Sequence, residues 1–270
     1  MEIEDIRRIG RRVHEGVKAV RARDQLPLER GAGGDRTFPV DRLAEDIILS
    51  GLRGLKLKLH VVSEEAGILD MEGAGEPITL AIDPVDGSKN AVAGISFFAA
   101  SIAAGHGGRL GDIESGYVIN LVTGDEYWAV RGGGAFLNGL PIRCQSGPEL
   151  KLALFEASSP ARHLRRILPL LEGAAKTRCM GSIALDLALL ASGAASFFVS
   201  PAQSRSFDYA AGYLLVKEAG GIFTGTDGND LDGLEIGLEK GSPLLASANQ
   251  RIHTAALKAL AQIPDKKDTS

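Results

Sequence analysis

Apolar residues follow a helical period at two places near the start of the chain. In the charged segment 3–20 they recur every three or four positions, which predicts an amphipathic helix that packs one stripe on a core. A second helical pattern begins at Asp41 and continues to about Leu52, with Asp41 as the predicted N-cap. That structural role competes with any catalytic role for Asp41. Residues 31–39, between the two patterns, are rich in glycine and end in proline, which predicts a mobile loop of the kind that closes on ligands.

The rest of the first half has the short apolar runs that are typical of strands. Strands are predicted at 57–62, 78–83 and 97–104, and 116–122 with 125–130 is expected to form an antiparallel pair. Residues 135–140 contain Asn138-Gly139, the signature of a tight hairpin. The first half is therefore predicted to be two helices laid against a largely antiparallel sheet.

Near Pro148 the pattern changes to an alternation of strands and helices, which favours layered α/β structure. The predicted strands are 152–157, 177–180, 195–199 and 244–248, and the predicted helices are 161–171, 183–191, 206–219 and 251–260. The tail 264–270 is expected to be loose. We accordingly divide the chain into an N-terminal α+β lobe, 1–147, and a C-terminal α/β lobe, 148–270.

Composition narrows the class of protein. The 270 residues are 44% hydrophobic and 24% charged, as in ordinary globular proteins, and the net charge of -4 argues against a nucleic-acid partner. Cys144 and Cys179 are far apart and form no zinc or disulfide pattern. No secretory signal and no membrane-spanning run is evident, so an intracellular, cytoplasmic protein without a membrane partner is expected. The sequence lacks a Gly-Lys pair, which excludes a Walker A loop.

The residues that carry chemistry begin at the end of the predicted strand 78–83. Asp83 and Asp86 flank a proline and a valine, and Gly87-Ser88 follows them. Such a turn places hard oxygen ligands beside backbone N–H groups that favour an anion, and Ser88 can cap a following helix. The same residue types are also common in plain surface turns, so this stretch alone leaves both interpretations open.

Two further motifs decide between these interpretations. Residues 63–67, Ser-Glu-Glu-Ala-Gly, precede the stretch, and residues 207–212, Phe-Asp-Tyr-Ala-Ala-Gly, follow it. With 83–88 they resemble, in order and spacing, the motifs of the inositol monophosphatase family, and most of all its archaeal type, which includes fructose-1,6-bisphosphatases. Segments 31–35, 134–139 and 217–221 extend the resemblance over nearly the whole chain. It implies a layered α+β fold, an alternating α-β-α-β-α sandwich, and a magnesium-dependent, lithium-inhibited sugar phosphatase that forms a homodimer.

The resemblance also implies roles for individual residues. The implied metal ligands are Glu64, Asp83, the carbonyl of Val85, Asp86 and Asp208. The implied catalytic pair, Asp41 and Ser88, would orient the attacking water. The implied substrate contacts are Gly87 and Ser88 for the phosphate, and Gly181, Ser182 and Arg205 near the sugar. Glu65 would lie just behind the ligands.

Simple electrostatics agrees with a metal site, because so many carboxylates could not stay ionised together in one cleft without cations. The resemblance implies two to three Mg²⁺ ions per site, with Mn²⁺ as an alternative, and such hard cations take carboxylate oxygens and accept phosphate as a ligand. Arg205 could pair with a second phosphate, which favours fructose-1,6-bisphosphate, with inositol-1-phosphate as a second substrate. Two alternatives stay open at this point. One is a phosphatase of the same family that acts on 3′-phosphoadenosine 5′-phosphate, and the other is a non-catalytic metal-binding relative.

Overall fold

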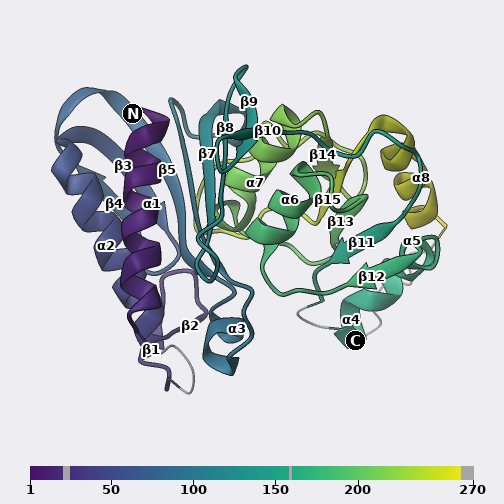
Figure 1. Ribbon diagram of the computed structural model, residues 1–270, viewed down its shortest axis with the longest axis horizontal. Helices are drawn as coiled ribbons and strands as arrows, with labels where there is room; N and C mark the ends of the chain where they lie inside the picture. Colours follow the sequence, from purple (N-terminus) through teal and green to yellow (C-terminus); the bar gives the residue numbers. More distant parts are fainter. Residues whose placement is uncertain (21–24, 158–159, 263–270) are drawn as a thin grey trace.

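The structure is a computed structural model in which residues 1–20, 25–157 and 160–262 are described. The predicted loose tail, 264–270, lies outside the described residues. Figure 1 shows the chain as successive layers of helices and sheets, seen edge-on from left to right. Two sheets form the β layers, and helices lie outside and between them. This arrangement confirms the predicted α-β-α-β-α sandwich.

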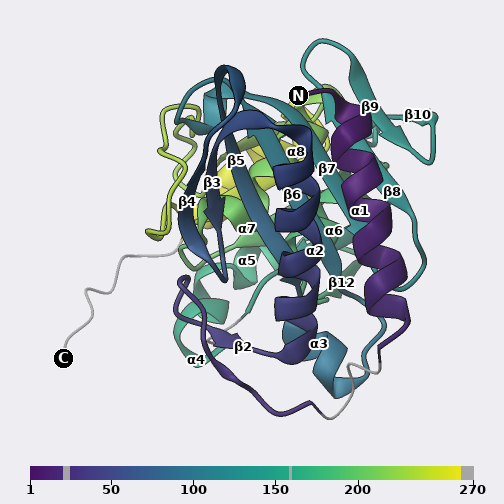
Figure 2. The same ribbon diagram turned by 90° about the vertical axis from the view of Figure 1, so that its left-hand side faces the viewer.

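The outer helical layer consists of the two amphipathic helices predicted from the start of the chain. These are α1 (Ile3–Lys18) and α2 (Pro39–Leu55), which pack on each other and on one face of the first sheet (Figure 2). The connection between them contains a short antiparallel pair, β1 (Glu29–Arg30) and β2 (Arg36–Thr37). The glycine-rich turn 31–35 therefore forms the tip of a small hairpin.

The first sheet has eight strands in the order β10-β9-β8-β7-β6-β5-β3-β4. Its strands are β3 (Leu57–Ser63), β4 (Gly67–Met71), β5 (Ala74–Asp86), β6 (Ala99–Gly105), β7 (Ile113–Asn120), β8 (Glu126–Val130), β9 (Gly134–Leu137) and β10 (Leu140–Ile142). All neighbouring pairs are antiparallel except β3 with β5. The Asn138-Gly139 hairpin is present, with both residues at positive φ, whereas β4 was not predicted. A short helix, α3 (Ser88–Ala93), follows β5, and a 3-10 turn, η1 (Leu110–Asp112), precedes β7.

The second sheet has five strands in the order β12-β11-β13-β15-β14. They are β11 (Leu152–Phe155), β12 (Lys176–Arg178), β13 (Phe197–Ser200), β14 (Ile222–Gly225) and β15 (Leu244–Ser247). Strand β11 runs parallel to both β12 and β13, whereas β15 is antiparallel to its neighbours. Strand β14 was not predicted. The predicted helix 161–171 is wrong as one continuous element: the chain forms α4 (Pro160–His163), the 3-10 turn η2 (Leu164–Arg166) and α5 (Leu168–Glu172).

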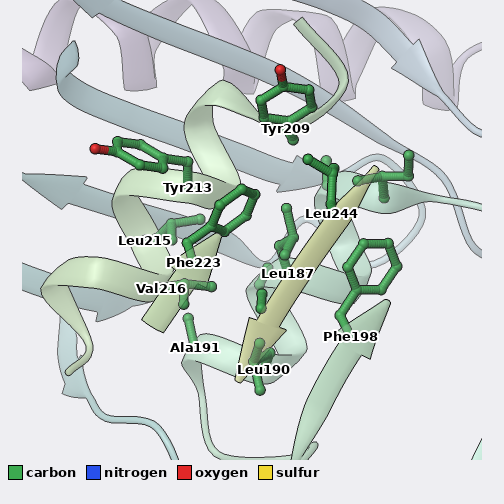
Figure 3. Close-up of a cluster of buried hydrophobic side chains, with 14 of the residues drawn as sticks. Leu187, Leu190, Ala191, Phe198, Tyr209, Tyr213, Leu215, Val216, Phe223 and Leu244 are labelled. Carbon is green, nitrogen blue, oxygen red and sulfur yellow. The ribbon is translucent and has the colours of Figure 1, made fainter. Parts of the chain in front are cut away.

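Two helices fill the space between the sheets. They are α6 (Ile183–Ala191) and α7 (Ser206–Glu218), and both are apolar on nearly every face because they are covered on both sides. Figure 3 shows side chains of α6 and α7, including Leu187, Leu190 and Tyr213, packed with Phe223 and Leu244 of the second sheet. The last helix, α8 (Gln250–Leu260), packs on α5 and on β15. This core contains residues from both halves of the chain, and the division into lobes at residue 147 stays a prediction.

Candidate active site

A β-bulge brings the two aspartates of the central motif to the same side of β5. The sequence predicted that the strand ends at Asp83, but β5 continues to Asp86. Asp83 is paired with Ser101 and Asp86 with Ala99, so three steps on β5 correspond to two on β6. Residues three apart point to opposite faces of a regular strand, and the extra residue of a bulge cancels that alternation. Pro84, which has no N–H to donate, is tolerated at such an irregularity.

Asp86 is held by the start of α6. Its Oδ2 accepts hydrogen bonds from the Ser182 hydroxyl at 2.7 Å and from the Ala184 N–H at 2.6 Å. The Ser182 oxygen also accepts a hydrogen bond from the Leu185 N–H and so caps the helix. Burial raises the pKa of Asp86, and these two donors oppose the rise. Ser182, predicted to lie near the sugar, is thus buried and oriented toward a candidate metal ligand.

Glu64 lies directly after β3 and beneath the glycine-rich turn. Its backbone N–H donates to Ile82 of β5, while its carbonyl accepts from the Gly33 N–H at 2.7 Å. A Cβ on Gly33 would lie 3.1 Å from Glu64 Cγ and 3.3 Å from Phe207 Cζ, so glycine favours this close approach. Burial raises the pKa of Glu64 well above its ordinary range, and the charges of Asp208 and Glu65 raise it further. The predicted mobile loop is therefore seated on the site.

Asp208 comes from the first turn of α7. Its Oδ2 accepts the backbone N–H of Arg205 at 2.8 Å, which caps the helix and fixes the carboxylate. Burial raises the pKa of Asp208 to about 6, opposed by this N–H and by the Arg205 guanidinium, while Asp35 and Glu156 add to the rise. Asp208 in turn raises the pKa of Asp83. The α7 start and the β5 bulge, distant in sequence, thus face one another.

Asp41 caps α2 from the third helical position and not as the N-cap residue. The predicted N-cap was wrong by three residues, since Phe38 is the N-cap, Pro39 opens the helix and Asp41 Oδ2 accepts the Phe38 N–H at 2.6 Å. Asp41 is 1% exposed, and burial raises its pKa to about 6 against the opposing effects of this N–H and the nearby Ser88 hydroxyl. Its other oxygen, Oδ1, is buried and has no hydrogen-bond partner among the described residues. Buried oxygens without a partner are rare and call for an unseen donor or cation.

The turn after β5 is closely packed. Gly87 has φ +96°, and a Cβ there would lie 3.1 Å from the Gly181 carbonyl oxygen, so glycine lets the two segments approach. The Ser88 hydroxyl donates to the Val85 carbonyl at 2.8 Å, which leaves that oxygen a second lone pair. Asn90, which was not predicted, donates to the Met180 carbonyl at 2.7 Å and holds α3 against the segment of Gly181.

Arg205 and Glu65 lie at the edge of the carboxylate cluster. The Arg205 Nη1 forms an ion pair with Asp35 Oδ2 at 3.0 Å, across the glycine-rich turn. Glu65 accepts a hydrogen bond from the Thr37 hydroxyl. Burial raises the pKa of Glu65 to about 7, and Asp41 and Glu45 add to the rise. All the sequence-predicted residues therefore lie in the segments that meet around β5, α6 and α7.

Two acidic residues beside this cluster were missed from the sequence. Glu156, at the end of β11, raises the pKa of both Asp86 and Asp208 by its charge. Asp186 is 0% exposed on α6, and neither of its carboxylate oxygens has a hydrogen-bond partner among the described residues. The sequence did contain a signal for Asp186, because it is the only charged residue in the apolar run 183–191. Carboxylates are seldom fully buried, and those that are often belong to functional sites.

The site offers hard oxygen donors in excess of local positive charge. Asp41, Glu64, Asp83, Asp86 and Asp208 all have pKa values raised, first of all, by burial. No three His, Cys, Asp or Glu side chains in the described part of the chain converge closely enough to enclose a metal ion as they stand. The donor set nevertheless suits a hard divalent cation that keeps several waters and takes only one or two carboxylates of its own. The residues fit such an ion chemically.

A separate cavity of about 580 Å³ lies away from these carboxylates. Its lining includes Ile167, Pro201 and Leu257 with the charged Arg166 and Lys258, and none of the residues assigned to the site above. The cavity therefore does not provide an apolar pocket for the carboxylate site.

Among the described helices, none is both long enough and apolar enough to cross a membrane.

Comparisons with known proteins identify relatives of the whole chain. A family model described as the inositol monophosphatase family matches residues 8–265. The fructose-1,6-bisphosphatase/inositol-1-monophosphatase of Methanothermobacter thermautotrophicus is 34% identical over 242 residues, 86% of each chain. The Nus factor SuhB of Pseudomonas aeruginosa is 32% identical, over 90% of this chain and 89% of that one. A crystal structure of the extragenic suppressor protein suhB from Bartonella henselae superposes with a TM-score of 0.82 at 26% identity, covering 96% and 98% of the two chains.

Proposed function

This chain belongs to the inositol monophosphatase family, and from that premise we propose that it hydrolyses sugar phosphate monoesters with Mg²⁺ and a water nucleophile. The observation that carries the proposal is the assembly of five buried or half-buried carboxylates, from four separate segments, around the β5 bulge. Membership of the family supports phosphate monoester hydrolysis in general. The metal, the individual substrate and the residue roles are the parts that we propose.

The proposed cation ligands are Glu64, Asp83, Asp86, Asp208 and the Val85 carbonyl. Their raised pKa values support this assignment, because a bound cation would remove the repulsion that burial and neighbouring charges create. When bound there, Mg²⁺ would supply charge neutralisation for the phosphate and would lower the pKa of water. Mn²⁺ could replace it, and Li⁺ is expected to inhibit.

The chain's own residues would position the reactants. Asp41 Oδ1, which has no hydrogen-bond partner among the described residues, would accept a proton of the attacking water. Ser88 lies close enough to Asp41 to lower the pKa of that carboxyl, so the two groups can share one water. Gly87, at φ +96°, gives the turn a backbone conformation that other residues rarely adopt, and this turn would hold the phosphate. Ser182 would act through Asp86, which it orients by a 2.7 Å hydrogen bond.

The proposed substrates are fructose-1,6-bisphosphate and inositol-1-phosphate. Relatives named for both activities support them. Arg205, whose side chain is 15% exposed, offers a guanidinium at the edge of the site that suits a second phosphate. Relatives named Nus factor SuhB bear a name that refers to no phosphatase activity, so the non-catalytic alternative stays open. Asp41 Oδ1, which has no partner among the described residues, fits the water-orienting role that the catalytic alternative needs. A homodimer and a cytoplasmic location are further parts of the proposal that the resemblance supports.

The proposal is tested by phosphate release from purified protein with fructose-1,6-bisphosphate, inositol-1-phosphate and 3′-phosphoadenosine 5′-phosphate. We expect turnover of the first two with Mg²⁺, none after chelation, and recovery when Mg²⁺ is added back. Turnover of the third substrate alone would move the assignment to a nucleotide phosphatase. No turnover of any of them would refute the enzyme assignment.

A further inference from the structure

Asp35 stands apart from the carboxylates assigned above because it is paired with a cation. It lies at the end of the glycine-rich turn, 170 residues from Arg205 in sequence, and its Oδ2 is 3.0 Å from Arg205 Nη1. We propose that Asp35 is a specificity-determining residue: its carboxylate occupies Arg205, and a sugar bisphosphate must displace it, whereas a monophosphate leaves the pair intact. This inference rests on the proposed function.

The position of Asp35 is set by the backbone of the turn. The Asp35 carbonyl accepts the Gly31 N–H at 3.0 Å, and the Gly34 N–H donates to the Gly31 carbonyl at 2.9 Å, so the five residues form one compact unit. The Ala32 and Gly33 N–H groups donate to the carbonyls of Glu65 and Glu64, which fastens this unit to the candidate metal ligand. Asp35 therefore reaches Arg205 from a turn that is already anchored at the site.

Arg205 is held from the other side. Its N–H caps α7 through Asp208, and the guanidinium carbon lies 6.0 Å from the centre of the Phe207 ring. The guanidinium end of Arg205 thus comes between the glycine-rich turn and the start of α7. Whatever binds Arg205 also determines whether the turn is tied to α7.

The exchange of partners at Arg205 should be easy. The Asp35 side chain is 57% exposed, and ion pairs that reach solvent to this degree are weak. A phosphate dianion can offer arginine two parallel charge-assisted hydrogen bonds, which are stronger than a single contact. The Asp35 carboxylate also has the same sign of charge as an approaching phosphate and therefore repels it. An acidic group at this point therefore weakens binding of a bisphosphate by competition and by repulsion, and leaves a neutral sugar hydroxyl unaffected.

The test compares two substrates in four proteins: the native chain, Asp35→Asn, Arg205→Gln and the double variant. Asp35→Asn is expected to lower KM for fructose-1,6-bisphosphate by about 2- to 5-fold, the range of a weak surface ion pair, and to leave KM for inositol-1-phosphate within about twofold. Arg205→Gln is expected to raise KM for the bisphosphate by about tenfold or more. In the double variant, which lacks Arg205, the replacement of Asp35 should lower KM for the bisphosphate by a smaller factor than it does in the native chain. Glu29→Gln is the matched control, because it breaks another ion pair of the same hairpin, with Arg42, and leaves Arg205 untouched.

Calorimetric titration of fructose-1,6-bisphosphate into the chelator-treated proteins separates this inference from the proposed function. Tighter binding by Asp35→Asn and weaker binding by Arg205→Gln would support the exchange even in a protein without turnover. Two results would overturn it. One is an equal change of KM for both substrates in Asp35→Asn. The other is a rise of about fivefold or more in the Mg²⁺ concentration needed for half-maximal activity, which would make Asp35 a metal ligand.

Discussion

Replacement of Asp41 by asparagine should stabilise the metal-free protein while it removes activity. Asp41 is buried, and its pKa is raised from 3.8 to about 6, mainly by desolvation. Asparagine keeps an oxygen that can accept the Phe38 N–H, so the cap of α2 is retained. The change therefore removes a charge and little else.

The magnitude follows from the linkage between protonation and folding. The folded state holds the Asp41 proton more tightly than the unfolded chain. The contribution of this protonation to the free energy of unfolding is therefore fully present below about pH 4 and is lost as pH rises through about 6. At about 1.4 kcal/mol per pKa unit, the native carboxylate costs about 3 kcal/mol at high pH. The stability of Asp41→Asn relative to the native protein should therefore increase by about 2 to 3 kcal/mol between pH 4 and pH 8.

The assay is urea unfolding at both pH values in the presence of a chelator. Comparing the two pH values cancels any constant difference between asparagine and protonated aspartate. Asp46→Asn is the control, because Asp46 is an exposed carboxylate on the same helix. A difference between Asp41→Asn and the native protein that stays constant with pH would refute the burial argument. Retained turnover would separately refute the role of Asp41 as proton acceptor.

Three further changes test the geometry around β5. Asp208→Asn should lower turnover by about 100-fold or more, because asparagine can still accept the Arg205 N–H but carries no charge for a cation; unchanged circular dichroism with near-normal turnover would contradict its role as a ligand. Ser182→Ala should lower the free energy of unfolding in urea by about 1 kcal/mol and raise the Mg²⁺ concentration needed for activity about 10-fold, because Asp86 loses a hydrogen bond that positions it. An unchanged Mg²⁺ titration would argue against that role. Gly87→Ala should lower the unfolding free energy by about 1 to 3 kcal/mol, because it combines φ +96° with a 3.1 Å contact to the Gly181 carbonyl, and thermal unfolding within error of the native protein would exclude this strain.

Most helices and strands follow from short-range patterns. The segment 3–20 became α1, the Asn138-Gly139 hairpin joins β9 to β10, and the apolar run 183–191 became α6. Errors occurred where the local pattern was ambiguous. Asp41 resembled an N-cap because acidic residues are common both at the N-cap and at the third helical position. The helix predicted at 161–171 is interrupted just before Pro169, which cannot continue a helix.

Most of the acidic residues of the candidate site were predicted from the sequence, but their arrangement was not. The resemblance of the motifs around Glu64, Asp83 and Asp208 to those of the family pointed to these acidic residues, whereas local patterns alone left the Asp83 turn open between a site and a plain surface turn. No local signal says that an extra residue in β5 turns Asp83 and Asp86 to one side, since that depends on the register with β6.

The sequence by itself determined the amphipathic outer helices and the strand-rich first half, because each depends on neighbours within a few positions. The acidic residues of the candidate site were indicated by the resemblance of their motifs to those of the family. Only the tertiary structure decided that Ser182 orients Asp86, that Glu156 adds its charge to the cluster, and that Asp35 occupies Arg205. Those contacts join residues about 70 to 170 positions apart. They exist because the two sheets pack on opposite sides of α6 and α7, which brings the start of each helix to the β5 bulge.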